Sequence, residues 1–376
     1  MASGAEKFRS PGPARGLRSG FSTGTAAAAA AKGAFLELLG LPCPEAVEVS
    51  LPGGSRLRVP LAGHAQVGNR GEAVVVKDAG DDPDVTHGAE IGVRLRWAPG
   101  GAAGETLRIL AGEGVGRVTK PGLPVAVGEP AVNPVPRRML AQAIEEVWAA
   151  CGHGRPLRLT VEIFVPRGEE LARHTLNPRL GIVGGISILG TTGLVVPYSH
   201  AAWRATIVTA LKVARAAGWR EAVFTTGGRS DAAMRRLLPA LPPECFVLMG
   251  DYVRFSLRAA AQLGFQRVTV AAYFGKAVKM AQGFGQTHAS RGLLDFPVLA
   301  RWVERATGNS FLAEAAARAN TARQVLEMLS PREALQVAAE VGRRLWAALH
   351  VFTGAGVHLR AVILDFQDAV LWQGEG

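Results

Sequence analysis

The stretch that decides the fold is "EAVFTTGGRSDAAMRRLLPALPPECFVLMGD", residues 221–251. It begins with an apolar run, continues through a glycine pair into a segment of helical period, and ends in a second apolar run. Short apolar runs joined by a helix are typical of parallel strands in an α/β sheet. Because such folds hold ligands at the carboxyl ends of their strands, the glycines after each run predict a binding edge.

The same alternation extends to both sides of this stretch. A mostly helical segment begins at about residue 292 and precedes a last strand-like run. We therefore predict a Rossmann-like, parallel-sheet α/β domain over residues 176–376, with a helical tail from about residue 292. Its other expected elements are strands over 185–190, 267–275 and 361–366 and helices over 199–218 and 252–264.

The first half of the chain lacks strict alternation. Its hydrophobic patterns predict helices and a hairpin, which together indicate an α+β layer. We predict an α+β domain over residues 16–175, a boundary near Thr175, and a flexible extension over residues 1–15. The expected elements are a helix from about Ala26 to Leu39, a hairpin over 45–62 and a helix over 136–152.

The chain has a formal net charge of +11, and only seven of its 42 basic residues are lysine. Arginine suits carboxylate and phosphate partners, so the excess favours nucleic acid or a polyanionic small molecule, although an arginine-rich genome would explain the same bias. The three cysteines form no C-x-x-C pair, which excludes a disulfide framework and an obvious zinc knuckle. With no secretory signal and no apolar run of spanning length, we expect a cytoplasmic protein with no membrane partner.

A cluster of hydroxyl groups precedes the first helix, in "GFSTGTAAAAAAK", residues 20–32. Ser22, Thr23 and Thr25 can cap free backbone N–H groups, and Gly24 lets another group approach the backbone. Capping needs one hydroxyl, whereas this segment has three. With the helix dipole they predict a site for an anionic substrate group, and plain capping is the alternative.

Carboxylates crowd the loop "VVKDAGDDPDVTHG", residues 75–88. Counted from Asp82, its sixth position is histidine where an EF-hand loop requires glycine, so no metal site is expected. Repulsion between the carboxylates predicts a cationic ligand or nearby arginines, and a solvated acidic turn is the alternative. We predict Asp78, Asp82 and His87 as catalytic residues and Lys77 as a substrate contact.

Glycine and threonine gather around the predicted strand ends. Their spacing matches neither G-x-G-x-x-G nor a P-loop, so they predict a nucleotide site of another kind, with ligand-free tight turns as the alternative. A carboxylate there can accept hydrogen bonds from a ribose or an adenine amino group. The predicted cofactor contacts are Gly184, Gly185, Gly190, Thr191, Thr192, Thr226, Gly227 and Asp251.

Three more polar residues stand in or next to loops. Arg137 follows the proline-set loop "GEPAVNPVP", and Lys276 shares a helix face with Lys279, so we predict Arg137 and Lys276 as substrate contacts. His288 follows a glycine-rich break and is a candidate acid or base, because histidine titrates near neutral pH. The alternative for the loop before Arg137 is a rigid connector, and the alternative for His288 is a structural role.

Seven motifs resemble, in order, the signatures of the cobalt-precorrin-5B C(1)-methyltransferases of anaerobic cobalamin synthesis, the CbiD-type enzymes. The resemblance covers about residues 16–295 and departs at Ala26, where the family usually has cysteine. No nucleophilic thiol is therefore needed there. The motifs are "GFSTGTAAAAAAK", "VKDAGDDPDVTHG", "NPVPR", "NPRLGIVGGISILGTTG", "TTGGRS", "GDYV" and "GKAVKMAQGFGQTHA".

The resemblance implies transfer of a methyl group from S-adenosylmethionine to carbon 1 of cobalt-precorrin-5B, which gives cobalt-precorrin-6A and S-adenosylhomocysteine. Cobalt arrives inside this corrinoid substrate, so the protein itself needs no metal. The resemblance assigns residues 16–175 to the substrate and residues 176–376 to S-adenosylmethionine. Two rivals stay open: another nucleotide-binding α/β enzyme with a polyanionic substrate, and a basic nucleic-acid-binding protein, which we disfavour because no aromatic-basic platform is present. The sequence leaves open whether the chain forms a homo-oligomer.

Overall fold

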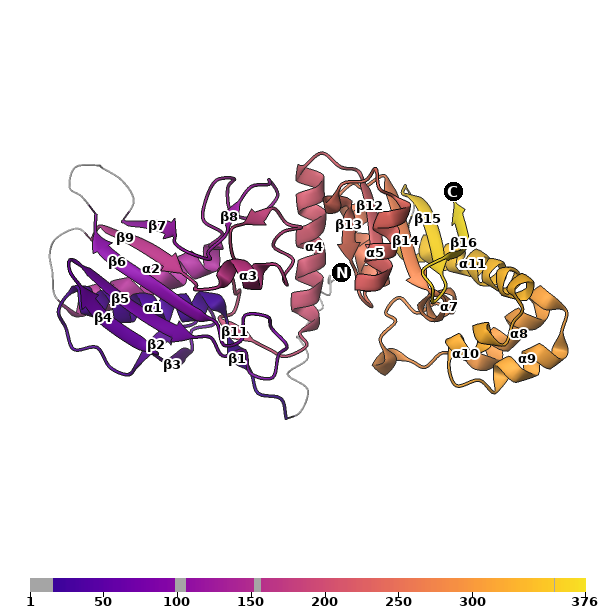
Figure 1. Cartoon of the computed structure of the whole chain (residues 1–376), viewed down its shortest axis with the longest axis horizontal. Coiled ribbons are helices and arrows are strands. Elements are labelled where there is room, and N and C mark those ends of the chain that lie inside the picture. The colour runs from indigo at the N-terminus through magenta and orange to yellow at the C-terminus, as the bar shows by residue number, and fades with distance from the viewer. Residues whose placement is uncertain (1–15, 99–105, 152–156, 355) are drawn as a thin grey trace, which may run out of the picture. The chain divides into compact units, whose positions relative to one another are not determined.

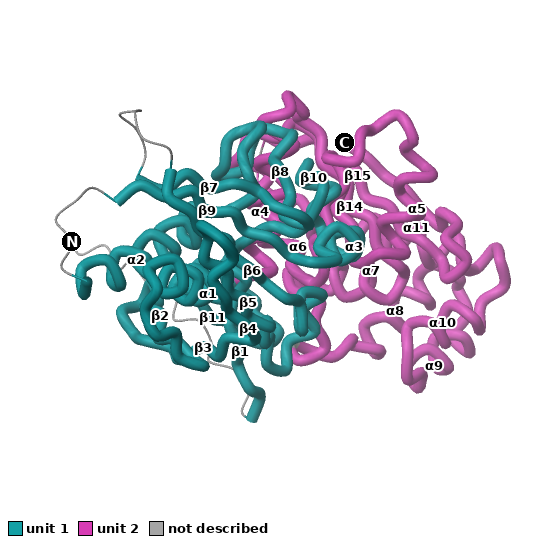
Figure 2. Tube along the Cα trace, turned by 60° about the vertical axis from the view of Figure 1, so that its left-hand side comes forward, with its two compact units in different colours: residues 1–201 teal, residues 202–376 magenta. Residues whose placement is uncertain are grey.

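The computed structural model describes residues 16–98, 106–151, 157–354 and 356–376, and the predicted extension over residues 1–15 lies outside them. The chain forms two compact units, residues 1–201 and residues 202–376 (Figures 1 and 2). Each unit has its own hydrophobic core. None of the described helices is long and apolar enough to cross a membrane.

The boundary between the units lies between residues 201 and 202, later in the chain than the expected position near Thr175. The difference arises because short strands beyond Thr175 pair with strands of the first unit. Both ladders are antiparallel and two residues long. They join β10 (Ile182–Val183) to β8 (Arg117–Val118), and β11 (Leu194–Val195) to β1 (Gly20–Phe21).

The first unit is built on a five-stranded sheet and two long helices (Figure 1). They are β4 (Gly63–Val67), β5 (Arg70–Val76), β6 (Glu90–Trp97), β7 (Leu107–Ala111), β9 (Leu159–Phe164), α1 (Thr23–Leu38) and α2 (Pro134–Ala150). The strand order is β4-β5-β6-β9-β7, and only β7 and β9 pair in parallel. The α+β layer predicted for this part of the chain is present, and α1 and α2 confirm its two predicted helices.

Helix α1 is enclosed by β5, β6 and α2. The side chains from Ala26 to Ala31 are all 0% exposed. The helix and the sheet approach so closely that a Cβ atom on Gly71 of β5 would lie 1.9 Å from the carbonyl oxygen of Ala34. The alanine run is therefore a packing requirement as well as a strong helix former.

The remaining elements of the first unit are short. The predicted hairpin over 45–62 is confirmed, because β2 (Ala46–Ser50) pairs antiparallel with β3 (Arg56–Pro60). A single-turn helix, α3 (Gly168–Ala172), follows β9.

The second unit contains the predicted parallel sheet. Its strands are β12 (Glu221–Thr225), β13 (Phe246–Leu248), β14 (Arg267–Tyr273), β15 (His358–Leu364) and β16 (Val370–Glu375). The order is β13-β12-β14-β15-β16, in which the first four strands are parallel and β16 is antiparallel. Counted along the chain, the parallel strands follow the order 2-1-3-4, so the topological switch lies between β12 and β14.

Helices cover both faces of this sheet. They are α4 (His200–Ala216), α5 (Gly228–Leu237), α6 (Val253–Gln262), α7 (Phe274–Ala281), α8 (Phe296–Thr307), α9 (Ser310–Ala317), α10 (Ala322–Glu327) and α11 (Pro331–Thr353). Residues of α5 pack on one face, and residues of α6, α7 and α11 belong to the larger core on the other face. The 3₁₀ turns Pro243–Cys245 and Ala289–Arg291 complete the unit.

One prediction about this unit needs correction. Residues 185–190 are not a strand of the parallel sheet, because Ile186 and Ile188 form isolated bridges with Val115 and Val132 of the first unit. A short apolar run indicates buried, extended backbone but not the sheet that it joins. The helical segment that begins near residue 292 is confirmed by α8 to α11, and the predicted strand over 361–366 corresponds to β15; the additional strand β16, which was not predicted, completes the sheet.

Candidate functional site

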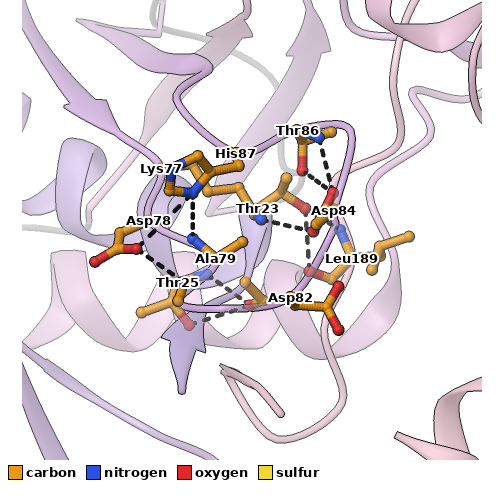
Figure 3. A network of polar contacts seen from close by, with 12 residues as sticks. Thr23, Thr25, Lys77, Asp78, Ala79, Asp82, Asp84, Thr86, His87 and Leu189 are labelled. Atoms are coloured by element: carbon orange, nitrogen blue, oxygen red, sulfur yellow. Dashed lines mark hydrogen bonds and ion pairs between the residues drawn. The ribbon is translucent and has the colours of Figure 1, made fainter. Parts of the chain in front are cut away.

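Four sequence motifs meet at the N-terminal end of α1 in the first unit. The hydroxyl cluster lies beside the acidic loop and beside Leu189 of the glycine-rich segment (Figure 3). Backbone hydrogen bonds join the motifs: Phe21 N to Asp78 O (2.8 Å), Gly24 N to Leu189 O (3.0 Å) and Asn133 N to Ile188 O (3.0 Å). Motifs separated by more than a hundred residues thus form one structure. We call it the α1 cluster, and it comprises residues 20–25, 77–88, 128–137 and 187–198.

The hydroxyl groups before and within α1 are engaged inside the chain. Ser22 is the N-cap, and its Oγ accepts a hydrogen bond from Thr25 N at 3.2 Å. Thr23 Oγ1 accepts from Leu189 N at 2.9 Å and donates to Leu189 O at 3.2 Å, while Thr25 Oγ1 donates to Gly193 O at 2.6 Å. All three side chains are buried. They hold residues 187–193 against the helix, and their predicted contact with a substrate stays a prediction.

The loop formed by residues 190–193 lies over the start of α1. A Cβ atom on Gly190 would come within 2.3 Å of Ser22 Oγ, and Gly190 has a φ of +141°, so both space and backbone conformation require glycine. Thr191 and Thr192 are exposed. Of the predicted contacts in this loop, these two therefore present side chains to solvent.

The eight predicted cofactor contacts do not share one sheet edge. Gly184 to Thr192 belong to the first unit, whereas Thr226, Gly227 and Asp251 follow strands of the second unit. Gly185 shapes a tight turn, since a Cβ atom there would lie 2.0 Å from the carbonyl oxygen of Gly114. A cofactor role for either set stays a prediction.

A buried ion pair shapes the acidic loop between β5 and β6. The side chain of Lys77 is 1% exposed, and its Nζ lies 2.7 Å from Asp84 Oδ2. Asp84 Oδ1 also accepts hydrogen bonds from Thr86 N at 2.8 Å and from Thr86 Oγ1 at 2.7 Å. Burial alone would raise the pKa of Asp84, but the charge and hydrogen bond of Lys77 and the bonds from Thr86 outweigh it and lower the pKa. Lys77 thus organises the loop, and its predicted substrate contact stays a prediction.

A second cation holds the beginning of the same loop. The guanidinium of Arg18 forms a two-pronged contact with the carboxylate of Asp78, with one arm from Nη2 to Oδ1 at 2.9 Å. The hydrogen bond from Arg18 lowers the pKa of Asp78 to about 2, against the effect of partial burial, with help from Gly80 N. His87 Nδ1 accepts from Ala79 N at 3.1 Å, so the neutral ring carries its proton on Nε2.

The three catalytic candidates of the loop differ in how far their side chains are already engaged by these contacts. With a pKa of about 2, Asp78 is a weak proton acceptor. His87 already uses its unprotonated nitrogen to accept a backbone hydrogen bond. Asp82 accepts one hydrogen bond from the backbone, from Tyr198 N to Oδ2 at 3.0 Å. Asp82 is therefore the candidate whose carboxylate is best suited to accept a proton or face a cation.

Arg137 lies in the first turn of α2 and closes the loop that precedes it. Its Nε donates to Val132 O at 2.8 Å, and its Nη2 lies 3.4 Å from a carboxylate oxygen of Glu129. Because its side chain remains 32% exposed, these contacts leave room for the predicted substrate contact, which stays a prediction.

The carboxyl edge of the second unit carries Asp251, after β13. Its Oδ1 accepts from Thr287 Oγ1 at 2.5 Å and lies 2.9 Å from Lys276 Nζ. Burial would raise the pKa of Asp251, but the bonds from Thr287 and Lys276 lower it. Lys276 belongs to α7, which follows β14, so this ion pair joins the two strands that flank β12. The other carboxylate oxygen, Oδ2, has no partner among the described residues and can accept from a ligand.

Open backbone lies at the switch point of the same sheet. Gly227 is the N-cap of α5 and Gly228 is its first residue. A Cβ atom on either glycine would meet no heavy atom within 4 Å, so a ligand group can approach the backbone here. Thr226 directly follows β12 and precedes these glycines, and its Oγ1 lies 3.5 Å from Ser230 Oγ.

Sequence reasoning missed a polar group at the adjoining strand ends. Tyr273 ends β14, and its hydroxyl donates to Asp368 Oδ1, beyond β15. Burial and this bond raise the pKa of Tyr273 to about 12. The ring of Tyr273 stacks on Phe366 with centroids 6.3 Å apart, and the guanidinium of Arg229 lies over the Tyr273 ring, 5.2 Å from its centroid. The rule that ligands bind at strand ends would have found Tyr273, whereas nothing local marks Asp368.

His288 stands next to Thr287 and caps a 3₁₀ turn. Its Nδ1 accepts from Ser290 N at 3.2 Å and lies 2.8 Å from Ser290 Oγ. The side chain has a local structural role, and its predicted catalytic role stays a prediction.

Comparisons with known proteins give the family. A family model described as CbiD matches residues 11–197, and one described as CbiD, C-terminal domain, matches residues 286–375. The chain belongs to the CbiD family. This confirms the resemblance seen in the sequence motifs and extends it to the C-terminal part.

CbiD relatives match most of the chain. A cobalt-precorrin-5B C(1)-methyltransferase of Nitratidesulfovibrio vulgaris is 50% identical over 350 residues, which cover 91% of this chain and 88% of that protein. The protein of the same name from Geobacillus kaustophilus is 46% identical over 367 residues, with coverages of 94% and 96%. The crystal structure of a cobalamin biosynthesis protein (CbiD) from Archaeoglobus fulgidus is 29% identical and covers 68% of this chain and 77% of that chain, with a TM-score of 0.40.

Proposed function

We propose that the chain is a cobalt-precorrin-5B C(1)-methyltransferase of cobalamin biosynthesis. The observation that carries this proposal is 50% identity over 91% of the chain with a relative of that name. Family membership over both parts of the chain supports it. The methyl donor is S-adenosylmethionine, and the products are cobalt-precorrin-6A and S-adenosylhomocysteine.

The methyl donor binds at the carboxyl edge of the parallel sheet in the second unit. Three features support this position: the switch point between β12 and β14, the open backbone at Gly227 and Gly228, and the Oδ2 atom of Asp251. Asp251 accepts hydrogen bonds from the ribose or the adenine amino group, while Lys276 and Thr287 hold its other oxygen in place.

The corrinoid binds to the exposed residues of the α1 cluster. Thr191 and Thr192 offer hydroxyl groups, and Leu189 and Tyr198 are 48% and 69% exposed and offer apolar surface to a flat macrocycle. The buried hydroxyls and the Lys77–Asp84 pair hold these loops in shape. Preorganised loops bind without first losing conformational freedom.

The protein has little covalent work to do in this reaction. Ring carbon 1 attacks the methyl carbon in line, a carbon–carbon bond forms, and the carbon–sulfur bond breaks with its electron pair going to sulfur. Positioning the two reacting atoms and excluding water lowers the barrier. The carboxylate of Asp82 faces positive charge on the reacting groups and accepts the proton that the macrocycle loses.

An activity assay tests the proposal directly. The full chain, cobalt-precorrin-5B and S-adenosylmethionine are incubated without air, and mass spectrometry follows the corrinoid. We expect one added methyl group and about one S-adenosylhomocysteine per product. A corrinoid that gains no methyl group would refute the assignment.

A binding experiment tests the donor site separately. In calorimetric titration S-adenosylhomocysteine should bind, whereas ATP and NADH should not. Replacing Asp251 with asparagine removes the charged acceptor and should weaken binding by about 1.5–3 kcal/mol, roughly 10–150-fold in Kd. The control is Glu304→Gln, an exposed carboxylate on α8, which should bind like the wild type. Equal affinity of the Asp251→Asn protein would remove Asp251 from the site.

A further inference from the structure

Three side chains that bind metals well meet at the C-terminal end of α1. Glu37 lies in the last turn of α1, Cys43 in the connection to β2, and His64 in β4. One carboxylate oxygen, the sulfur and one imidazole nitrogen lie within 4.8 Å of one another. The packing of β4 against α1 brings His64 to the other two residues.

The arrangement matches the needs of a zinc-like ion. Thiolate, imidazole and carboxylate are the three ligand types of Zn²⁺, and bonds of about 2.0–2.3 Å place tetrahedral ligand atoms about 3.3–3.8 Å apart. His64 Nδ1 lies 2.7 Å from Glu37 Oε1, so side-chain rotations that move these two atoms about 1 Å further apart would make room for the ion. The side chain of His64 is 31% exposed, which leaves a fourth position for water.

The surrounding backbone holds the ligands in place. Pro42 and Pro44 flank Cys43 and fix their φ angles, so the thiol stands on a stiff connection. His64 pairs with Ala73 of β5, which fixes its position along the edge of the sheet.

The charge of the cluster favours a cation. No lysine or arginine in the described part of the chain forms an ion pair with Glu37, whose recorded ion-pair partner is His64. A divalent cation would balance the charge of the Glu37 carboxylate and bind Cys43 as the thiolate, with release of the thiol proton.

We propose that Glu37, Cys43 and His64 form a binding site for a divalent transition-metal ion, with Zn²⁺ as the preferred occupant. The ion ties the edge strand β4 and the connection to β2 to the end of α1. The proposal is independent of methyl transfer and differs from the sequence expectation of no protein metal. Sequence patterns could not reveal the site, because its ligands come from three elements with irregular spacing.

The test uses the full chain without a histidine tag, kept reduced. Equilibrium dialysis with Zn²⁺ should give about one ion per chain, and Zn²⁺ should raise the thermal midpoint. Co²⁺ should show a thiolate-to-metal absorption band. Cys43→Ser and His64→Gln should each weaken binding by more than about tenfold, the least that losing even an outer partner usually costs. The matched control is Cys151→Ser, a second half-buried free thiol outside the cluster, which should bind like the wild type.

Three outcomes would overturn the proposal: no thiolate band with Co²⁺, wild-type affinity in the Cys43→Ser protein, or equal loss of binding in the Cys151→Ser protein. Circular dichroism of the metal-free variants shows whether they fold. If Cys43→Ser is unfolded, His64→Gln decides the question, because His64 is exposed on an edge strand and its replacement leaves the core intact.

Discussion

The ion pair between Lys77 and Asp84 leads to a prediction about stability: replacing Asp84 should cost more free energy of unfolding than replacing Lys77. The side chain of Lys77 is 1% exposed and that of Asp84 is 27% exposed. Replacing Asp84 with asparagine leaves an ammonium group buried without its partner, which usually costs about 3–5 kcal/mol. Replacing Lys77 with methionine keeps the aliphatic stem and leaves a partly hydrated carboxylate that Thr86 still bonds. We expect this change to cost less, about 1–3 kcal/mol.

The pH dependence of the two proteins should also differ. The lowered pKa of Asp84 stabilises the wild type above the unfolded value of about 4, and this stabilisation is lost as the pH falls through the folded pKa. The difference in free energy of unfolding between the wild type and the Asp84→Asn protein should therefore become smaller in acid.

The assay must report on the first unit alone, because a chain with two compact units need not unfold in one step. Hydrogen exchange of the amides of β5 and β6, measured by mass spectrometry across a urea series, gives the local free energy of opening. The control is Glu48→Gln, which breaks an exposed ion pair with Arg56 and should cost no more than about 1 kcal/mol. If Asp84→Asn costs no more than Glu48→Gln, the pair does not organise the loop and the reasoning fails.

Two further changes test the α1 cluster and the sheet beneath it. Thr25→Val removes one of the two hydrogen bonds to the carbonyl of Gly193, which Ser22 N still bonds, so we expect a loss of about 1 kcal/mol in urea unfolding and faster exchange over residues 187–193. The exposed control Thr191→Val should stay within about 0.5 kcal/mol, and equal values would contradict the role of the hydroxyl. Gly71→Ala forces a methyl group against the backbone of α1 and should cost at least about 1–3 kcal/mol in free energy of unfolding. The control Gly63→Ala places its methyl group in open space on β4 and should be nearly neutral. A Gly71→Ala protein as stable as the wild type would show that α1 and β5 approach less closely than described.

Periodicity predicted the parallel sheet but not the strands that belong to it. Residues 221–251 alternate strand and helix within 31 residues, so local pattern decides their fold. Residues 185–190 have the same apolar character, yet their partners are Val115 and Val132. Pairing between distant segments depends on tertiary structure, which periodicity does not report.

The candidate site shows the same division. The excess hydroxyls near Thr23 signalled an unusual helix start, and the structure shows that Thr23 bonds the backbone of Leu189. The sequence could not identify this partner, because it lies 166 residues away in the chain. The position of Asp251 at the edge of the sheet could be predicted because it comes soon after the end of β13, whereas Asp368 reaches Tyr273 from beyond the last parallel strand.

The attachment of α1 to residues 187–193 bears on how the protein is made. Thr25 and its acceptor Gly193 are 168 residues apart in the chain. At a synthesis rate of roughly 5–20 residues per second, the ribosome releases the helix about 10–30 s before its partner segment exists. During translation the hydrogen bonds between the start of α1 and residues 187–193 therefore cannot form until this later segment has been made.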